Sequence, residues 1–365
     1  MASTDEIEFD SRFIRIYKSG LIQRLIPSDF VQPSIDPETR VSSKDMTINP
    51  QTSLSARIYL PNLAHSPSSR LPLIIYYHGG AFCLGSAFSS FTHNYLNPLV
   101  AQLNIVLVSV SYRLAPEHPI PAAYDDSWEA LKWAAAHVNG EGPDDWLSAH
   151  ADFDRLFLAG DSAGGNIAHN VAMRAGTERV GDGVEIEGSV MIHPYFLEGK
   201  KSNSTEDMEK MWRMTCPSTT GLDDHRINPM AQMAPTLMGL GCRRVLVCLG
   251  EDFLREGGRS YCERLMESGW EGEGEVFETK GEGHAFHVFD VGSEKAIAQT
   301  RKISDFINGY SNTDWADDPL DQHSISGYCT FVGGNLVTWR SKKQTVVALP
   351  SAEAEYKAMA YAPAR

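Results

Sequence analysis

The residues Gly160, Asp161, Ser162, Ala163 and Gly164 give the strongest chemical signal in the sequence. They follow the apolar run RLFLA and precede a segment with helical patterning. In that context a serine sits on a sharp strand-to-helix turn, where small neighbours are needed because backbone segments crowd together. The N–H groups that open the following helix would favour an oxyanion beside the hydroxyl. The spacing predicts Ser162 as a nucleophile; the alternative is a glycine-rich turn whose serine only caps a helix.

A serine hydroxyl becomes a good nucleophile only beside a base, and that base needs an orienting acid. In strand–turn–helix hydrolases the chain order is serine, then acid, then histidine. Asp252 comes just after the apolar run RRVLVCLG, and His284 follows the strand-like VFETK and a glycine-containing turn. We predict Asp252 as the acid and His284 as the base. Their neighbours Glu251 and His287 remain the alternatives for these two roles.

A pair of glycines at the end of another apolar run offers hydrogen-bond donors. His78, Gly79, Gly80 and Ala81 come directly after LPLIIYY. Consecutive glycines let the backbone approach a substrate closely and present unobstructed N–H groups. We predict an oxyanion hole formed by the N–H groups of Gly79, Gly80 and Ala163. His78 is expected to brace this loop; the alternative is an ordinary turn at a strand end.

The elements that must position these residues alternate between strand-like and helix-like segments. The apolar runs LPLIIYY, NIVLVSVSY, RLFLAG, GSVMIHPYF and RRVLVCLG are typical of strands covered on both faces. Helical patterning lies between them, most clearly in AAYDDSWEALKWAAAHV. This alternation predicts an α/β fold with a mostly parallel central sheet and helices on both faces. Residues 198–230 predict a small helical cap over the carboxyl edge of the sheet, with an amphipathic helix near residues 13–25 beside it.

Composition narrows the classes of partner. The chain has 365 residues and a formal net charge of −15, which disfavours nucleic acid and anionic membrane surfaces. No apolar run approaches the roughly 20 residues that span a bilayer. The acidic N-terminus and six scattered cysteines predict a cytoplasmic protein with free thiols, without a signal peptide, metal or cofactor. A small-molecule substrate is the expected partner, and the chain is expected to be a monomer or weak homodimer.

Several longer motifs resemble those of the plant carboxylesterase family, which is related to hormone-sensitive lipase. They are HGGAF, SYRLAPEHPIPAAYDD, GDSAGGNIAHN, INPM, GEDFLREGG and GHAFHVF, and the resemblance covers about the first 308 residues. It implies an α/β-hydrolase fold, no cofactor, and hydrolysis of esters with small or moderate acyl groups through an acyl-enzyme. Position by position it supports Ser162 as nucleophile, Asp252 as acid and His284 as base, with Gly79 and Gly80 in the oxyanion hole.

Two related groups leave the activity open. The family is similar to 2-hydroxyisoflavanone dehydratases, which keep the fold but eliminate water from a flavonoid. It is also similar to gibberellin receptors, which bind a hormone and have lost the catalytic histidine. This chain retains His284, which favours an enzyme. Ala81 departs from the third glycine of the wider HGGG pattern, but the oxyanion hole described above does not require it.

The C-terminal residues 309–365 break this pattern and resemble the ribonuclease H region of copia-type retrotransposon polyproteins. They predict hairpin strands followed by the start of a helix, a short α+β fragment. Ribonuclease H needs several carboxylates to hold two divalent ions. Asn312 stands where that family has its first metal-binding aspartate, Glu355 matches the second, and the chain stops at Arg365 before a third. We predict an α/β-hydrolase domain over residues 1–308 and an inactive truncated fragment over residues 309–365.

Overall fold

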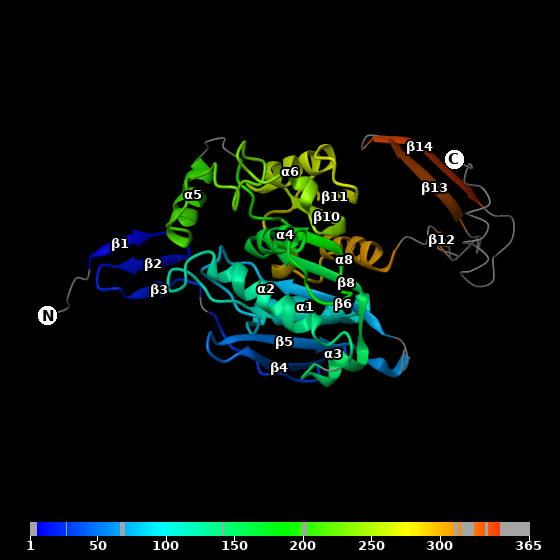
Figure 1. The fold of residues 1–365 in the computed structure, drawn as a ribbon, viewed down its shortest axis with the longest axis horizontal. Helices are drawn as coiled ribbons and strands as arrows, with labels where there is room; N and C mark the ends of the chain where they lie inside the picture. The colour runs from blue at the N-terminus through cyan, green and yellow to red at the C-terminus, as the bar shows by residue number, and fades with distance from the viewer. Residues whose placement is uncertain are drawn as a thin grey trace. The chain divides into compact units, whose positions relative to one another are not determined.

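A computed structural model describes residues 6–26, 28–65, 70–140, 142–198 and 203–309, together with three strands between residues 313 and 343. The chain divides into two compact units, Met1–Ile307 and Asn308–Arg365. The candidate site residues all belong to the first unit. Figure 1 shows the elements of both units.

The first unit is built on an eight-stranded sheet with the order β11-β10-β9-β8-β6-β7-β5-β4. The strands are β4 (Ser42–Asn49), β5 (Leu54–Leu60), β6 (Leu71–Tyr77), β7 (Val106–Ser111), β8 (Ala151–Asp161), β9 (Ile186–Ile192), β10 (Cys242–Gly250) and β11 (Glu273–Thr279). Every pairing among β6 to β11 is parallel, whereas β5 pairs antiparallel with β7 and β4. The expected mostly parallel sheet is therefore confirmed.

Helices cover both faces of this sheet, as the alternating sequence pattern predicts. They are α1 (Ser90–Leu103), α2 (Ala122–Ala135), α3 (Asp145–His150), α4 (Ala163–Ala175), α5 (Asn203–Thr215), α6 (Arg255–Glu267), α7 (Phe286–Phe289) and α8 (Glu294–Asn308). Two cores result, because successive strand residues point to opposite faces. On one face Ile74 and Tyr76 of β6 pack with α1 and α8, and on the other Leu73 and Tyr77 pack with α2, α4 and α6.

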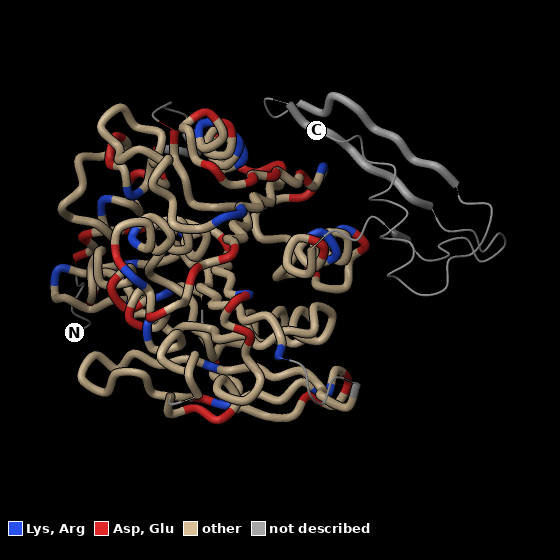
Figure 2. Tube along the Cα trace, turned by 45° about the vertical axis from the view of Figure 1, so that its right-hand side comes forward, with Lys and Arg blue, Asp and Glu red and all other residues tan. Residues whose placement is uncertain are grey.

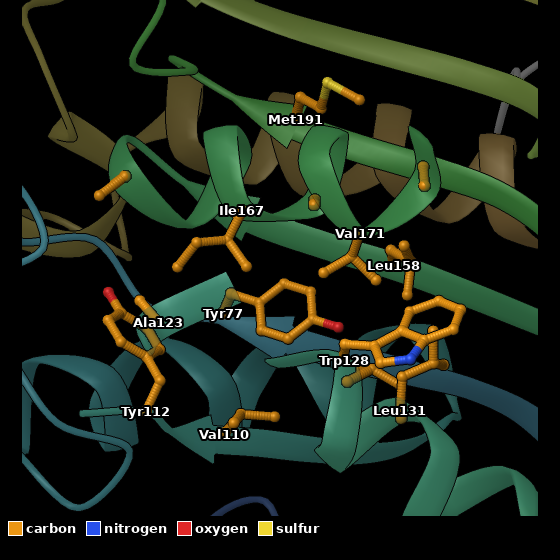
Figure 3. Close-up of a cluster of buried hydrophobic side chains, with 14 of the residues drawn as sticks. Tyr77, Val110, Tyr112, Ala123, Trp128, Leu131, Leu158, Ile167, Val171 and Met191 are labelled. Atoms are coloured by element: carbon orange, nitrogen blue, oxygen red, sulfur yellow. The ribbon is translucent and has the colours of Figure 1, made fainter. Parts of the chain in front are cut away.

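Figure 3 shows the second of these cores around Tyr77 of β6. Ile167 and Val171 of α4 and Trp128 of α2 pack against the strands there, and all four side chains are buried. Full burial of one large apolar side chain contributes about 1.5–3 kcal/mol. This packing anchors α4, and α4 in turn fixes the turn that precedes it.

The N-terminal segment differs from the prediction. Instead of a helix near residues 13–25, it forms an antiparallel three-stranded sheet of β1 (Ile7–Asp10), β2 (Ile14–Tyr17) and β3 (Ile22–Arg24). Gly20 has φ +87° in the turn between β2 and β3, where a helix would have to continue. The apolar residues that suggested a helical face belong to separate short strands on either side of that turn.

The predicted cap is present in residues 203–215, which form the helix α5. Its backbone is tied to the chain after β9, because Tyr195 Oη donates to the Met208 carbonyl at 2.9 Å. Met208 also lines the cavity that contains Ser162, so α5 lies over the carboxyl edge of the sheet as expected.

Charged side chains and cysteines occupy different parts of the structure. Figure 2 shows acidic and basic residues interspersed along outer helices and loops. Five cysteines have described side chains, and all five are buried and free. Within the described ranges, no helix has both the length and the apolar character needed to cross a bilayer.

The second unit contains three described strands, β12 (Thr313–Asp314), β13 (Ile325–Val332) and β14 (Asn335–Lys343). β13 and β14 form an antiparallel hairpin, as the sequence predicts. Asn312, Glu355 and the expected helix start lie outside the described residues. The assignment of this unit to a ribonuclease H fragment stays a prediction.

Candidate active site

Ser162 lies on the sharp turn between β8 and α4, the position that the sequence pattern predicts. Its backbone has φ 53° and ψ −115°, a conformation that is costly for a residue with a side chain. The turn is closely packed, because a Cβ atom added at Gly164 would lie 1.8 Å from the Tyr77 carbonyl oxygen. The Ser162 N–H donates to the Ile192 carbonyl at 2.8 Å, which ties this strained turn to β9.

The Ser162 hydroxyl is directed to a base rather than to its own helix. It makes no capping hydrogen bond to α4, so the alternative of a capping serine fails. Its Oγ lies 2.9 Å from Nε2 of His284. Nδ1 of His284 lies 2.7 Å from Oδ2 of Asp252, and Oδ1 of Asp252 accepts a hydrogen bond from the Leu254 N–H at 2.8 Å. The three predicted side chains, 122 and 32 positions apart along the chain, meet in one hydrogen-bonded row.

The environment keeps the Asp252 carboxyl ionised. Burial by itself raises the pKa of this carboxyl, but the neighbouring imidazole of His284, which donates its Nδ1–H at 2.7 Å, counteracts that effect, and the pKa lies well below its usual range. Both rings have a nitrogen within 3.3 Å of Oδ2. A carboxylate in this state accepts the Nδ1–H of His284, which leaves Nε2 unprotonated toward the serine.

The two alternative residues take no part in this row. The side chain of Glu251 is exposed to solvent, and its backbone N–H donates to the Glu282 carbonyl at 2.6 Å. His287 is buried against Tyr95 and His193, and neither ring nitrogen has a hydrogen-bond partner in the described structure. Burial lowers the pKa of His287 well below its ordinary value, so its ring is neutral. Of the residues that the sequence offers for the two roles, Asp252 and His284 are the ones that lie in the hydrogen-bonded row.

The glycine loop after β6 departs from the prediction at Gly79. The Gly79 N–H donates to Oδ1 of Asp161 at 2.9 Å, so it points to that carboxylate rather than to a substrate. A backbone N–H has a single hydrogen to donate, and an ionised acceptor makes a strong bond. Gly80 and Ala81 follow it in the loop and line the same cavity as Ser162. Ala163 opens α4, where first-turn N–H groups have no acceptor within the helix.

His78 braces this loop, as expected. Its ring is buried and stacks on Tyr112 with a centroid distance of 4.3 Å, and Nδ1 lies 2.7 Å from the Gly79 carbonyl oxygen. Burial lowers the pKa of His78, which keeps the imidazole neutral. Gly80 completes the tight turn with φ 115°, and an added Cβ there would lie 2.2 Å from the Leu84 carbonyl oxygen. Several contacts therefore hold the loop in this conformation.

The sequence and the fold are similar to those of known proteins. Residues 74–288 match the family whose description is the alpha/beta hydrolase fold. The chain belongs to this family. The hydrolase is 45% identical over 313 residues to "Probable carboxylesterase 1" of Arabidopsis thaliana. This match covers 83% of the hydrolase and 98% of that protein. It is 44% identical over 315 residues to the "Tuliposide A-converting enzyme b2, amyloplastic" of Tulipa gesneriana, covering 84% and 82% respectively.

A solved structure supports the same fold. EstE1, a thermophilic carboxylesterase cloned from a metagenomic library, superposes on the hydrolase with a TM-score of 0.60 and 29% identity. The match covers 76% of this chain and 90% of that one. The expected α/β-hydrolase fold is confirmed.

The cavity above Ser162 has a volume of about 240 Å³ and is mainly apolar. Its walls combine the loop after β6, α1, the cap helix α5, the segment around α7, and the loops beside the N-terminal strands. The apolar lining includes Phe13, Ile26, Leu84, Phe91, Met208, Phe253, Val288 and Phe289. Sequence reasoning missed the contributions of Phe13 and Ile26, because no local motif marks a wall residue from a separate small sheet.

One group of side chains in the hydrolase has the composition of a metal site. His193, Asp252 and His284 offer ligand atoms that lie within 4.8 Å of one another, the only such group within the described ranges. Two of these atoms already form the short hydrogen bond between His284 and Asp252. Hydrogen bonding therefore accounts for the cluster without a metal ion.

Proposed function

We propose that this hydrolase is a serine carboxylesterase that cleaves small to medium carboxylic esters through an acyl-enzyme on Ser162. The broader class is carboxylic ester hydrolase, to which the family, its carboxylesterase relatives and its esterase neighbours assign the chain. One observation supports the mechanism above all others. It is the row of hydrogen bonds from Ser162 through His284 to Asp252, at 2.9 and 2.7 Å.

In the acylation step His284 acts first as a base and then as an acid. Nε2 takes the proton of the Ser162 hydroxyl while Oγ attacks the carbonyl carbon of the ester. The tetrahedral intermediate collapses, His284 returns the proton to the departing alkoxide, and the alcohol leaves. Asp252 holds the imidazole in the required tautomer and stabilises its cation without becoming protonated itself.

In the deacylation step water takes the place of the alcohol. His284 removes a proton from the water as its oxygen attacks the acyl carbon, and the new C–O bond gives the carboxylic acid. Ser162 leaves with the proton that His284 returns. No group beyond these side chains and backbone donors is required by this scheme.

The oxyanion hole is proposed to use Gly80, Ala81 and Ala163. Gly79, which the sequence suggested, is engaged with Asp161. Gly80 and Ala81 lie on the cavity wall beside Ser162, and Ala163 is the first residue of α4. Preorganised donors of this kind each contribute about 2.7–4 kcal/mol to transition-state stabilisation. Gly79 has a supporting role, because its bond to Asp161 fixes the loop that presents the next two N–H groups.

The cavity limits the substrate. About 240 Å³ with apolar walls accommodates a short acyl chain together with a small alcohol group. Apolar lining favours uncharged aliphatic or aromatic groups next to the ester, because a buried charge without a partner is costly.

A panel of p-nitrophenyl esters with increasing acyl length tests this function, with Ser162→Ala as the control. Turnover that depends on Ser162 and declines for long acyl chains supports the proposal. A protein that binds ligands without turnover would be a receptor. Elimination of water from a 2-hydroxyisoflavanone, with no ester hydrolysis, would make it a dehydratase. Either outcome would refute the esterase assignment.

We further propose that the hydrolase acts in the cytoplasm as a monomer or weak homodimer. We also propose that residues 309–365 are a ribonuclease H-like retrotransposon segment without nuclease activity. The antiparallel hairpin of β13 and β14 agrees with that resemblance. Purified protein that cleaves the RNA strand of an RNA–DNA hybrid in Mg²⁺ would contradict the inactive assignment.

A further inference from the structure

His193 is a buried histidine that is not part of the Ser162–His284–Asp252 row. It lies beside the loop that carries Asp252 and the loop that carries His284. It follows the last residue of β9, and its N–H donates to the Cys248 carbonyl of β10 at 2.8 Å. The preceding residue, Ile192, accepts the N–H of Ser162 at 2.8 Å. The backbone at His193 is therefore held between the strand that ends at the nucleophile and the strand that ends near the acid.

The side chain of His193 lies beside Asp252 and beside the loop that carries His284. Only 1% of the side chain is exposed. Nδ1 accepts the N–H of Ala285, the residue after His284, at 3.1 Å, and the same atom lies 3.3 Å from Oδ2 of Asp252. The His193 and His284 rings lie 5.6 Å apart. The imidazole of His193 therefore contacts both the Asp252 carboxylate and the backbone next to His284.

The contact with Ala285 assigns the tautomer of His193. An N–H that donates to Nδ1 needs the lone pair there, so we place the ring proton on Nε2, which has no hydrogen-bond partner among the described residues. In this tautomer Nδ1 cannot donate to Asp252. His284 is then the imidazole that donates to Oδ2, at 2.7 Å.

The surroundings leave His193 little freedom to move. Its φ of 46° is in the left-handed region, which histidine and asparagine enter more readily than most residues. A Cβ atom added at Gly250 would lie 2.9 Å from its Cε1. Phe286 and His287 pack beside the ring, with centroids 5.6 and 5.5 Å away. Because the His193 ring is held in place, its hydrogen bond also holds the Ala285 backbone in place.

We propose that His193 is a positioning residue for ester hydrolysis: it accepts the Ala285 N–H and thereby holds the His284 loop in register with Asp252 and Ser162. This inference rests on the proposed function. His193 touches neither the reacting hydroxyl nor the cavity wall, so it acts through His284. The Ala285 backbone has φ 58°, an unfavourable conformation for alanine that an external hydrogen bond helps to maintain.

Two substitutions at this position separate positioning from packing. His193→Asn keeps an acceptor close to where Nδ1 lies and tolerates positive φ. His193→Gly also tolerates positive φ but has no acceptor. We expect His193→Gly to lower kcat for p-nitrophenyl acetate by about 10- to 100-fold, because a misplacement of about 1 Å costs that much, with KM changed less than about twofold. His193→Asn should recover kcat to within about fivefold of wild type.

The matched control is His137→Ala. His137 is also fully buried, and its Nε2 likewise accepts a backbone N–H, from Asp144 at 3.0 Å, but it lies outside the cavity and the catalytic row. This variant should lower the unfolding temperature while folded protein keeps its kcat. Equal losses of kcat in His193→Gly and His193→Asn, or wild-type kcat in folded His193→Gly, would overturn the positioning role.

The tautomer provides a test that needs no variant at His193. Nitrogen-15 NMR of the histidine-labelled full chain should show an unprotonated Nδ1 and a protonated Nε2 for His193, with His193→Asn used only to assign the signals. A protonated Nδ1 at neutral pH would refute the proposal. Failure of the proposed function is distinguishable, since it would appear as unchanged hydrolysis in Ser162→Ala whatever happens at His193.

Discussion

The backbone N–H of Gly79 donates to the carboxylate of Asp161 at 2.9 Å, across 82 positions of the chain. This bond joins the loop after β6 to the turn that presents Ser162. The Tyr76 hydroxyl donates to the same oxygen at 2.6 Å, so two donors converge on Oδ1. The turn at Ser162 and the loop after β6 are therefore held by one shared acceptor.

Removal of that acceptor should weaken both stability and turnover. Asp161→Ala leaves the Gly79 N–H and the Tyr76 hydroxyl without their partner, and each unsatisfied buried group costs about 1–3 kcal/mol. We expect a clear fall in unfolding temperature and a decrease in kcat of about 10- to 100-fold as the loop loosens. Thermal unfolding and steady-state hydrolysis measure the two effects. Tyr76→Phe removes only one of the donors and should have a smaller effect on kcat; an equal or larger loss would contradict this account.

Substitution of the nucleophile should abolish activity without unfolding the protein. Ser162→Ala removes the Oγ that faces His284, and loss of such a nucleophile lowers kcat by about 10⁶-fold in a serine hydrolase. The side chain makes no bond to α4, so the helix loses no cap. Hydrolysis and circular dichroism of the same sample test both statements. Residual turnover within tenfold of wild type would exclude Ser162 as the nucleophile.

The adjacent carboxylates Glu251 and Asp252 form a matched pair. Asp252→Asn disturbs the tautomer of His284 and should lower kcat by about 10⁴-fold, as in other triads. Glu251→Gln changes an exposed side chain that does not contact His284 and should stay within about twofold of wild type. Steady-state kinetics of the two variants, measured under the same conditions, show which of the two carboxylates acts as the acid. The reverse order of effects would transfer the acid role to Glu251.

Buried neutral histidines should make the fold sensitive to acid. Burial, reinforced by the neighbouring charge of His225, lowers the pKa of His169 to about 3, whereas an unfolded histidine titrates near about 6.5. Between these values the unfolded chain binds a proton that the folded chain does not, so stability is lost as pH falls below about 6.5. For this one residue the loss reaches about 1–2 kcal/mol at pH 5.

A substitution at His169 isolates that contribution. His169→Gln keeps a polar partner near the Tyr261 hydroxyl, 3.0 Å from Nδ1, but cannot take up the proton. Urea unfolding at pH 7 and pH 5 should show a smaller loss of stability for this variant than for wild type. His118→Gln, at an exposed position, serves as the control and should keep the wild-type pH dependence. An unchanged pH dependence in His169→Gln would refute the assignment.

Deletion of residues 309–365 should leave hydrolysis intact. The residues of the candidate site and its cavity all lie within the first unit, Met1–Ile307. We expect kcat and KM of the shortened protein to agree with those of the full chain within about twofold. A folded deletion variant that loses most of its activity would show that the second unit contributes to the site.

Much of the fold and of the site could be predicted because short sequence patterns, such as apolar runs and glycine spacing, depend on local structure. The apolar runs that became β6 to β10 are buried on both faces, and such strands leave a continuous signature in sequence. The turn at Ser162 could also be predicted from the sequence, because only small residues fit where Gly160 and Gly164 approach other backbone segments. The sequence predicts a helix where the N-terminal strands lie, because apolar positions in a short segment fit either period. The turn at Gly20 decides between the two.

By itself the sequence predicted Ser162, Asp252 and His284 as a cooperating set, a mostly parallel sheet with helices on both faces, and the class of chemistry. Residue type and spacing suffice there because the turn geometry is local. Only the tertiary structure decided that Gly79 serves Asp161, that Phe13 lines the cavity, and that His193 binds the loop of the base. Those relationships join segments that are distant in the chain, and a hydrogen bond or a wall contact between such segments exists only after the sheet brings their ends together.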